Sequence, residues 1–368
     1  MNLTKEIHAK IKQEGYLTFD EFIDMSLYFP NYGYYNNPNT EFGPKNSDFI
    51  TAPEISEIYT CSILKFYKDI RKHKKIENVL EFGAGSGAMA FNFLNNCEAK
   101  NLPNKYYIVE KNIHLIEKQN KKLKELSKNL YEKIVWVKDI KAIDDVFIIA
   151  NEILDAIPAK FFKKEDDKFF EKSVKEEGEK LVISLQDCKE YLLEEIYSIE
   201  SRLGNKIPNS YSFEINFLQE KFLSEIFNKI NNFILLIIDY GYHEEEFFHP
   251  QRKNGTVQFY KNHCKIEDIF SYPHGSFDIS VSVDFSRVFR TALNYGIKLY
   301  SFTTQSQFLL NTNILEFAQK IEGEFDKNNI LKTLLFPSDM GENFKIMVLC
   351  DDISGEFQSS FKDFRHKL

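Results

Sequence analysis

Residues 81–87 read Glu81-Phe82-Gly83-Ala84-Gly85-Ser86-Gly87, and they join a strand predicted at 78–82 to a helix predicted at 87–96. Glycine adopts positive φ freely and has no Cβ, so glycines at alternate positions let a ligand approach the main chain. The N-terminus of a helix also favours anionic groups. The segment therefore predicts a nucleotide-like cofactor, the alternative being a tight turn without a ligand.

The glycine spacing argues against phosphate-rich ligands. A dinucleotide fingerprint needs its third glycine at position 88, and a Walker motif needs Gly, Lys and a hydroxyl residue there, but the chain has Ala88 and Met89. A second strand, predicted at 105–109, is followed by Glu110, whose carboxylate can accept both hydroxyls of a ribose. An adenosine without phosphates fits both features, which predicts S-adenosylmethionine as the cofactor.

The segments around this turn alternate between strands and helices, which predicts an α/β fold with a Rossmann-like parallel sheet. Between 159 and 186 the hydrophobic period shifts toward two, which predicts an antiparallel insertion, and helices are expected from about 190 to 229. The domain prediction has four parts: N-terminal helices and a binding loop at 1–75, a core at 76–158 and 230–350, an inserted α+β subdomain at 159–229, and a tail at 351–368.

Composition excludes several classes of function. The 368 residues carry a net charge of −8 without a long basic block, which argues against nucleic-acid binding and mildly favours a cationic partner. The odd number of cysteines and the absence of C-x-x-C or H-x-x-x-H spacing argue against disulfides and metal, so we expect a reducing compartment. We find no membrane-length apolar run and no signal or transit peptide, and expect a cytoplasmic protein.

Acidic and amide side chains follow three more of the predicted strands. They are Asp139, the group Asn151, Glu152 and Asp155, and the pair Asp239 and Tyr240. Carboxyl ends of parallel strands meet at one edge of a sheet, so we expect these residues to converge. Two carboxylates there can grip a planar guanidinium. The alternatives are that Asp155 caps a helix, that Glu152 pairs with a surface lysine, and that Asp239 has a structural hydrogen-bonding partner.

An irregular stretch at 30–53 is rich in Gly, Pro, Asn and aromatic residues. Its length predicts a binding loop. Pro53 and Glu54, at its end, are candidates to line the pocket, although Thr51 and Glu54 fit a helix capping box equally well.

Ordered motifs along nearly the whole chain are similar to those of the MidA-like S-adenosylmethionine-dependent methyltransferases. These are PNYGYY from Pro30, DFITAPEIS from Asp48, EFGAGSG from Glu81, ANEILDAIP from Ala150, IDYGY from Ile238, GTVQFY from Gly255, DISVSVDFS from Asp278, TTQSQFLL from Thr303 and MGENFK from Met340. The chain departs from the family pattern at Ser47, at Tyr59-Thr60 in place of Phe-Gly, and at 311–313, which puts local loop conformation in doubt.

The resemblance implies a class I methyltransferase fold and the following roles. Cofactor binding falls to Glu81, Gly83, Gly85, Gly87, Glu110, Asp139 and Asn151; catalysis to Glu152, Asp155 and Asp239; and substrate binding to Tyr240, Asp284, Pro53 and Glu54. Mitochondrial members of the family are complex I assembly factors that methylate an arginine of a complex I subunit. The resemblance therefore implies a protein partner with an accessible arginine, such as a respiratory complex subunit. For the oligomeric state of the protein itself, a homodimer is considered. The alternatives are a small-molecule acceptor, or an assembly chaperone with little catalysis.

Overall fold

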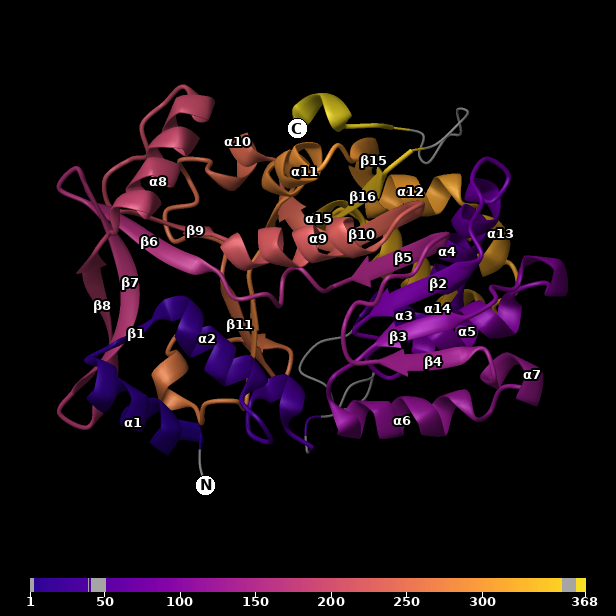
Figure 1. Ribbon diagram of the computed structural model, residues 1–368, viewed down its shortest axis with the longest axis horizontal. Coiled ribbons are helices and arrows are strands. Elements are labelled where there is room, and N and C mark those ends of the chain that lie inside the picture. The colour runs from indigo at the N-terminus through magenta and orange to yellow at the C-terminus, as the bar shows by residue number, and fades with distance from the viewer. Residues whose placement is uncertain (1–2, 39, 41–50, 353–361) are drawn as a thin grey trace.

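The computed structural model describes residues 3–38, 40, 51–352 and 362–368. Residues 41–50 of the predicted binding loop and 353–361 of the predicted tail lie outside the described residues. Figure 1 shows a mostly parallel sheet flanked by helices on the right, and an antiparallel sheet with the N-terminal helices on the left. The predicted α/β class with an extra antiparallel part is confirmed.

The main sheet has eight strands in the order β15-β16-β10-β5-β2-β3-β4, and β14 pairs with β10. β10, β5, β2, β3 and β4 run parallel, whereas β16 is antiparallel to both of its neighbours. The strands are β2 (Asn78–Phe82), β3 (Tyr106–Val109), β4 (Ile134–Val137), β5 (Val146–Asn151), β10 (Phe233–Tyr242), β14 (Val283–Asp284), β15 (Lys298–Thr304) and β16 (Phe344–Cys350). The strand order reverses between β2 and β5, which is where ligands bind in such sheets.

Both faces of the main sheet are buried, which explains why its central strands are continuously apolar. In β10, Ile234 and Leu236 pack on one face, while Leu235 and Ile237 pack on the other. The first face is covered by α4 (Glu57–Ile70), α5 (Ala88–Asn96), α6 (Ile113–Leu123), α12 (Gln305–Asn311), α13 (Ile314–Ala318) and α14 (Glu324–Leu335); the second is covered by α9 (Phe217–Lys229) and α11 (Phe285–Asn294).

The second part of the molecule contains two smaller antiparallel sheets. One has the strands β1 (Leu17–Thr18), β6 (Lys160–Glu165), β7 (Lys168–Glu177), β8 (Lys180–Asp187) and β9 (Tyr211–Ile215); the other has β11 (Gln258–Lys261), β12 (Cys264–Lys265) and β13 (Asp278–Ser280). α1 (Leu3–Glu14) and α2 (Phe19–Tyr28) share an apolar cluster with Phe161, Val174 and Ile279, which come from both sheets. Segments far apart in sequence thus form one body beside the main sheet (Figure 1).

One sequence prediction differs from the structure. The region expected to be helical from about 190 to 229 contains α8 (Glu190–Leu203), strand β9 and then α9. β9 is short and fully buried, and it pairs with β6, so a contact distant in sequence overrides the local helical pattern. α6, which follows β3, ends at Leu123, and the short α7 (Lys128–Tyr131) comes after it. α9 packs on α11 over the main sheet.

Short helices complete the structure: α3 (Ala52–Ile55), α10 (Glu244–Phe247), α15 (Met340–Asn343) and the 3₁₀ turns Tyr34–Asn36, Ala99–Asn101, Ile269–Ser271 and Arg365–Lys367. Within the ranges that the structure describes, no helix combines the length and the apolar character needed to cross a bilayer.

Candidate active site

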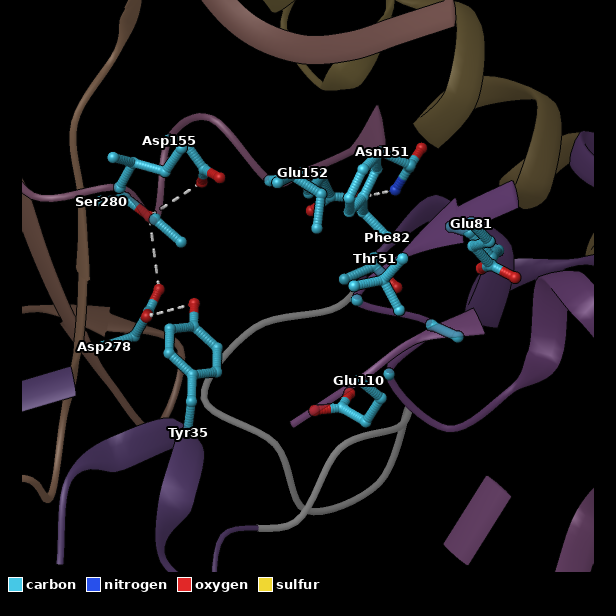
Figure 2. Close-up of a pocket in the computed structure, with 18 of the residues that line it drawn as sticks. Tyr35, Thr51, Glu81, Phe82, Glu110, Asn151, Glu152, Asp155, Asp278 and Ser280 are labelled. Atoms are coloured by element: carbon cyan, nitrogen blue, oxygen red, sulfur yellow. Dashed lines mark hydrogen bonds between the residues drawn. The ribbon is translucent and has the colours of Figure 1, made fainter. Parts of the chain in front are cut away.

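A cavity of about 980 Å³ lies at the carboxyl ends of β2, β3, β5 and β10. Its wall is completed by residues from α2, from the turn that follows it, and from β11 and β13. Figure 2 shows Glu81 and Glu110 on one side of the cavity and Asp155 and Asp278 on the other. The cavity therefore has one end on the main sheet and one end toward the second part of the molecule.

The glycine turn lines the main-sheet end. Gly83 and Gly85 have φ values of +56° and +53°, which L side chains rarely adopt. A Cβ added at Gly85 would meet no atom within 4 Å and would stand in the open space of the cavity. Gly87 instead caps α5, a Cβ added there would lie 3.5 Å from Gln119, and Gly87 is not among the residues that line the cavity. The bare main chain at 83–85 thus forms a cradle that a side chain would fill.

Two acids follow the neighbouring strands, as the sequence predicts. Glu110, after β3, is largely buried and accepts a hydrogen bond from the Asn112 N–H at 2.9 Å through Oε1. Burial raises the pKa of its carboxyl, with the main-chain and Gln119 donors opposing the rise. Asp139, after β4, lines the same end but is mostly exposed, and lies 3.5 Å from Lys111. Glu110 therefore lines the cavity beside the cradle.

Glu81 and Glu54 also line the cavity near the glycine turn. Glu81 accepts a hydrogen bond from the Tyr106 hydroxyl at 2.8 Å, and burial raises its pKa to about 7. Glu54 accepts a hydrogen bond from Ser86, within the glycine turn. Pro53 lies beside it in the cavity wall. The beginning of α3 and the glycine turn are thereby connected at the main-sheet end.

Glu152 occupies the centre of the cavity wall, directly after β5 (Figure 2). It has a φ of +53°, a conformation uncommon for a residue with a side chain. Its Oε1 accepts from Asn151 Nδ2 at 3.1 Å, and Asn151 Oδ1 accepts from the Tyr59 hydroxyl at 2.7 Å. Burial, and secondly the charge of Asp155, raise the pKa of Glu152 to about 8. The groups that shift this pKa include no lysine of the described residues, so the alternative of a surface lysine pair for Glu152 does not hold there.

Asp155 lies at the far end of the cavity, in a chain of hydrogen bonds (Figure 2). Ser280 Oγ is 3.1 Å from Asp155 Oδ2 and 3.3 Å from Asp278 Oδ2, and the Tyr35 hydroxyl donates to Asp278 Oδ1 at 2.9 Å. Burial raises the pKa of Asp155 to about 6 and that of Asp278 to about 7. Nearby hydroxyls, including that of Tyr240, oppose the rise for Asp155.

Asp239 and Asp284 do not line this cavity. Asp239 is fully buried behind the wall, where Oδ2 accepts from the N–H groups of Leu154 and Asp155 at 2.9 and 3.2 Å. Asp284 caps α11 by accepting from the Arg287 N–H at 3.1 Å. Both therefore have structural hydrogen-bonding partners, whereas Tyr240, next to Asp239, does line the cavity.

The sequence reasoning assigned no role to four residues at the far end of the cavity: Tyr28, Tyr35, Asp278 and Ser280. Two motifs quoted for the resemblance contain three of them, since PNYGYY ends at Tyr35 and DISVSVDFS begins at Asp278. The positions were therefore visible in the sequence, but their location beside Asp155 was not.

Comparisons with known proteins agree with this arrangement. A family model described as "Putative S-adenosyl-L-methionine-dependent methyltransferase" matches residues 60–303. The chain is 26% identical to the Caenorhabditis elegans "Protein arginine methyltransferase NDUFAF7 homolog, mitochondrial", covering 95% of this chain and 86% of the relative. The Drosophila melanogaster homologue of the same description is 25% identical, over 95% and 84% of the two chains.

A solved structure is similar over the full length. The Burkholderia thailandensis protein, described as a "COG1565 superfamily member and likely methyl transferase" bound to S-adenosyl-homocysteine, superposes with a TM-score of 0.92. It is 25% identical in sequence, and the match covers 100% of this chain and 96% of that one.

Proposed function

This chain belongs to the MidA-like family of S-adenosylmethionine-dependent methyltransferases, and from this premise we propose that it methylates an arginine side chain of a protein. S-adenosylmethionine is the cofactor of this family. Arginine as the acceptor is supported by the description of the Caenorhabditis elegans and Drosophila melanogaster relatives as protein arginine methyltransferases and by the acidic end of the cavity.

The residues at the main-sheet end fit the cofactor. Gly83 and Gly85 would lie against it, Glu110 would accept its ribose hydroxyls, and Asp139 would face the adenine side. When bound, S-adenosylmethionine supplies an electrophilic methyl group on a sulfonium sulfur. The chain itself contributes mainly the position of the acceptor relative to that methyl.

One observation carries the proposal: the cavity that begins at the glycine turn ends among carboxyl groups. Glu152 and Asp155 line it on the side away from Glu110 (Figure 2). A guanidinium has five N–H donors in a planar fork, which suits recognition by more than one carboxylate. A neutral acceptor would gain less from this concentration of acid, because its hydrogen bonds to carboxylates lack the charge of a guanidinium.

Glu152 is the candidate base. Without a ligand its pKa of about 8 keeps it largely protonated at neutral pH, because of burial and the nearby charge of Asp155. A guanidinium beside it favours the carboxylate form and so lowers that pKa. The acceptor nitrogen must lose one proton overall when the new carbon–nitrogen bond forms, and Glu152 is placed to accept it. Asn151, itself held by Tyr59, fixes the direction of the Glu152 carboxylate.

Incubation of the protein with methyl-labelled S-adenosylmethionine and a cell extract tests the proposal. A labelled protein band whose label is recovered in methylated arginine supports it. Label in small molecules instead indicates a small-molecule acceptor. Binding of the cofactor by calorimetry without transfer of label indicates a cofactor-binding assembly protein. If the folded protein binds no S-adenosylmethionine, the proposal fails at its first step.

A further inference from the structure

Asp278 is an acid of the cavity wall without an assigned role. It belongs to β13, in the small three-stranded sheet, and its side chain is buried. It lies on the opposite side of the cavity from Glu110, and Ser280 links it to Asp155 (Figure 2). The second part of the molecule thus contributes its own carboxylate to the site formed at the main sheet.

The Asp155–Ser280–Asp278 group is short of hydrogen-bond donors. Ser280 Oγ is within hydrogen-bond distance of both carboxylates but has a single proton, so it can donate to one of them at a time. Asp155 is only 7% exposed, and its Oδ1 has no hydrogen-bonding partner in the part of the chain that the structure describes. The Tyr240 hydroxyl is close enough to lower the pKa of Asp155 but makes no hydrogen bond with Oδ1. A buried acceptor facing a cavity without a donor indicates a ligand that supplies one.

The group also has no counter-charge among the described residues that line the cavity. The lysines of the wall are Lys111 and Lys138, and they belong to the cofactor end, where Lys111 lies 3.5 Å from Asp139. Glu152 adds a third carboxyl nearby and raises the pKa of Asp239 behind the wall. Burying several acids together is costly unless a cation joins them.

Two aromatic rings form the wall beside Asp278. Tyr28 and Tyr35 both line the cavity and are stacked, with ring centroids 5.6 Å apart and planes inclined by 22°. Their hydroxyls donate to Ala156 O at 2.8 Å and to Asp278 Oδ1 at 2.9 Å, which fixes the rings in place. Aromatic faces attract the flat, weakly hydrated guanidinium group more than a hydrated ammonium.

We propose that Asp278 and Asp155 form a guanidinium subsite, in which Asp278 selects a planar cation as acceptor and Tyr35 positions the Asp278 carboxylate. The guanidinium supplies the donors that Asp155 and Asp278 lack, and the tyrosine rings cover its face. This inference rests on the proposed function, since it names the residues that distinguish an arginine side chain from other acceptors.

Binding can be tested without turnover. The peptides Gly-Gly-X-Gly-Gly, with arginine, lysine or citrulline at X, are titrated by calorimetry into protein saturated with S-adenosylhomocysteine. Citrulline has the shape of arginine without its charge. The wild-type protein is expected to bind the arginine peptide at least about tenfold more tightly than the other two, because citrulline lacks the charge and the lysine ammonium lacks the planar fork of donors that can reach two carboxylates.

The variants assign the preference to Asp278. Asp278→Asn is expected to reduce the arginine-to-citrulline ratio at least about tenfold, while the Kd for S-adenosylhomocysteine changes less than about twofold. Tyr35→Phe should reduce the ratio less, because the carboxylate stays but loses its positioning donor. Asp187→Asn, a substitution of an exposed residue at the end of β8, is the matched control. If Asp278→Asn does not fold, Ser280→Ala takes its place, and a fall in the ratio is again expected.

Several outcomes overturn the inference. They are equal binding of the arginine and citrulline peptides by the wild-type protein, equal binding of the arginine and lysine peptides, no binding of any of the three, or an unchanged ratio in Asp278→Asn. Failure of S-adenosylhomocysteine to bind is a different result: it removes the proposed function itself, whereas the outcomes above leave cofactor binding intact and remove only the subsite.

Discussion

The carboxylate of Asp239 accepts a hydrogen bond from the main-chain N–H of Asp155 at 3.2 Å. Asp239 thus holds, from behind the cavity wall, the main chain of Asp155, whose side chain faces the cavity. Asp239 Oδ2 also accepts from Leu154 N–H, and Oδ1 accepts from the Tyr240 N–H at 3.0 Å. Burial, and then the charges of Asp155 and Glu152, raise the pKa of Asp239. From this geometry we propose that Asp239 is a positioning residue.

Replacement of Asp239 by alanine should therefore destabilise the protein. Three N–H groups lose their acceptor in this variant. Removal of one of several neighbouring acids also reduces the repulsion among them, which offsets part of that loss. We therefore expect a decrease of about 2 kcal/mol in the free energy of unfolding. Urea unfolding measures it. Asp187→Ala, at an exposed position, should change stability by less than about 0.5 kcal/mol. Equal stability of the two variants would remove the positioning role.

Replacement of Gly85 by valine should prevent cofactor binding. The φ of +53° is strained for valine, and its side chain would fill the cradle. We expect the affinity for S-adenosylmethionine to fall by more than about tenfold, which corresponds to about 1.4 kcal/mol. Gly178→Val is the matched control, because Gly178 has a φ of +65° with equally open surroundings but lies in the turn between β7 and β8. Calorimetry should show normal binding in the control; equal losses in both would mean that backbone strain alone is responsible.

Replacement of Glu152 by glutamine should leave cofactor binding intact and remove turnover. Loss of a general base typically reduces the rate about 100- to 10,000-fold. In the wild-type protein, kcat/KM should rise with pH and level off above the pKa of about 8, since the base acts in its deprotonated form. Glu179→Gln, at an exposed position, should keep the wild-type profile. Undiminished methylation by Glu152→Gln would exclude this residue from the mechanism.

The stability of the ligand-free protein should fall as pH rises from 6.5 to 9. Burial raises the pKa of Glu152 to about 8 and that of Asp278 to about 7, above their values in the unfolded chain. The folded state therefore binds more protons in this window, and that advantage is lost as pH passes through the folded pKa values. His274, whose pKa is lowered to about 4, acts only below this window.

Thermal unfolding across this pH range measures the effect. The Glu152→Gln and Asp278→Asn variants should each show a smaller decrease in Tm with pH than the wild-type protein, because the substituted side chain no longer titrates. A decrease as steep as that of the wild-type protein in both variants would assign the pH dependence to other groups.

Local sequence signals predicted the main sheet well. The glycine turn after Phe82 and the acid at position 110 lie where the pattern placed them, because each depends on a strand and the turn directly after it. The continuous apolar run that begins at Phe233 is visible in the sequence, and it lies in β10, a strand buried on both faces. The β9 strand was missed, because its pairing with β6 bridges residues far apart in sequence.

The sequence by itself determined the class of fold, the glycine turn after the first strand of the main sheet and the strand ends at which the acids gather, since these follow from periodicity and from the backbone freedom of glycine. Tertiary structure alone decided which acids face the cavity. Tyr35 meets Asp278 across 243 positions and Ser280 meets Asp155 across 125, so no local pattern contains either contact. These contacts form only when the N-terminal helices and the small sheets pack beside the main sheet, and that packing turns Asp155 toward the cavity while Asp239 remains behind its wall.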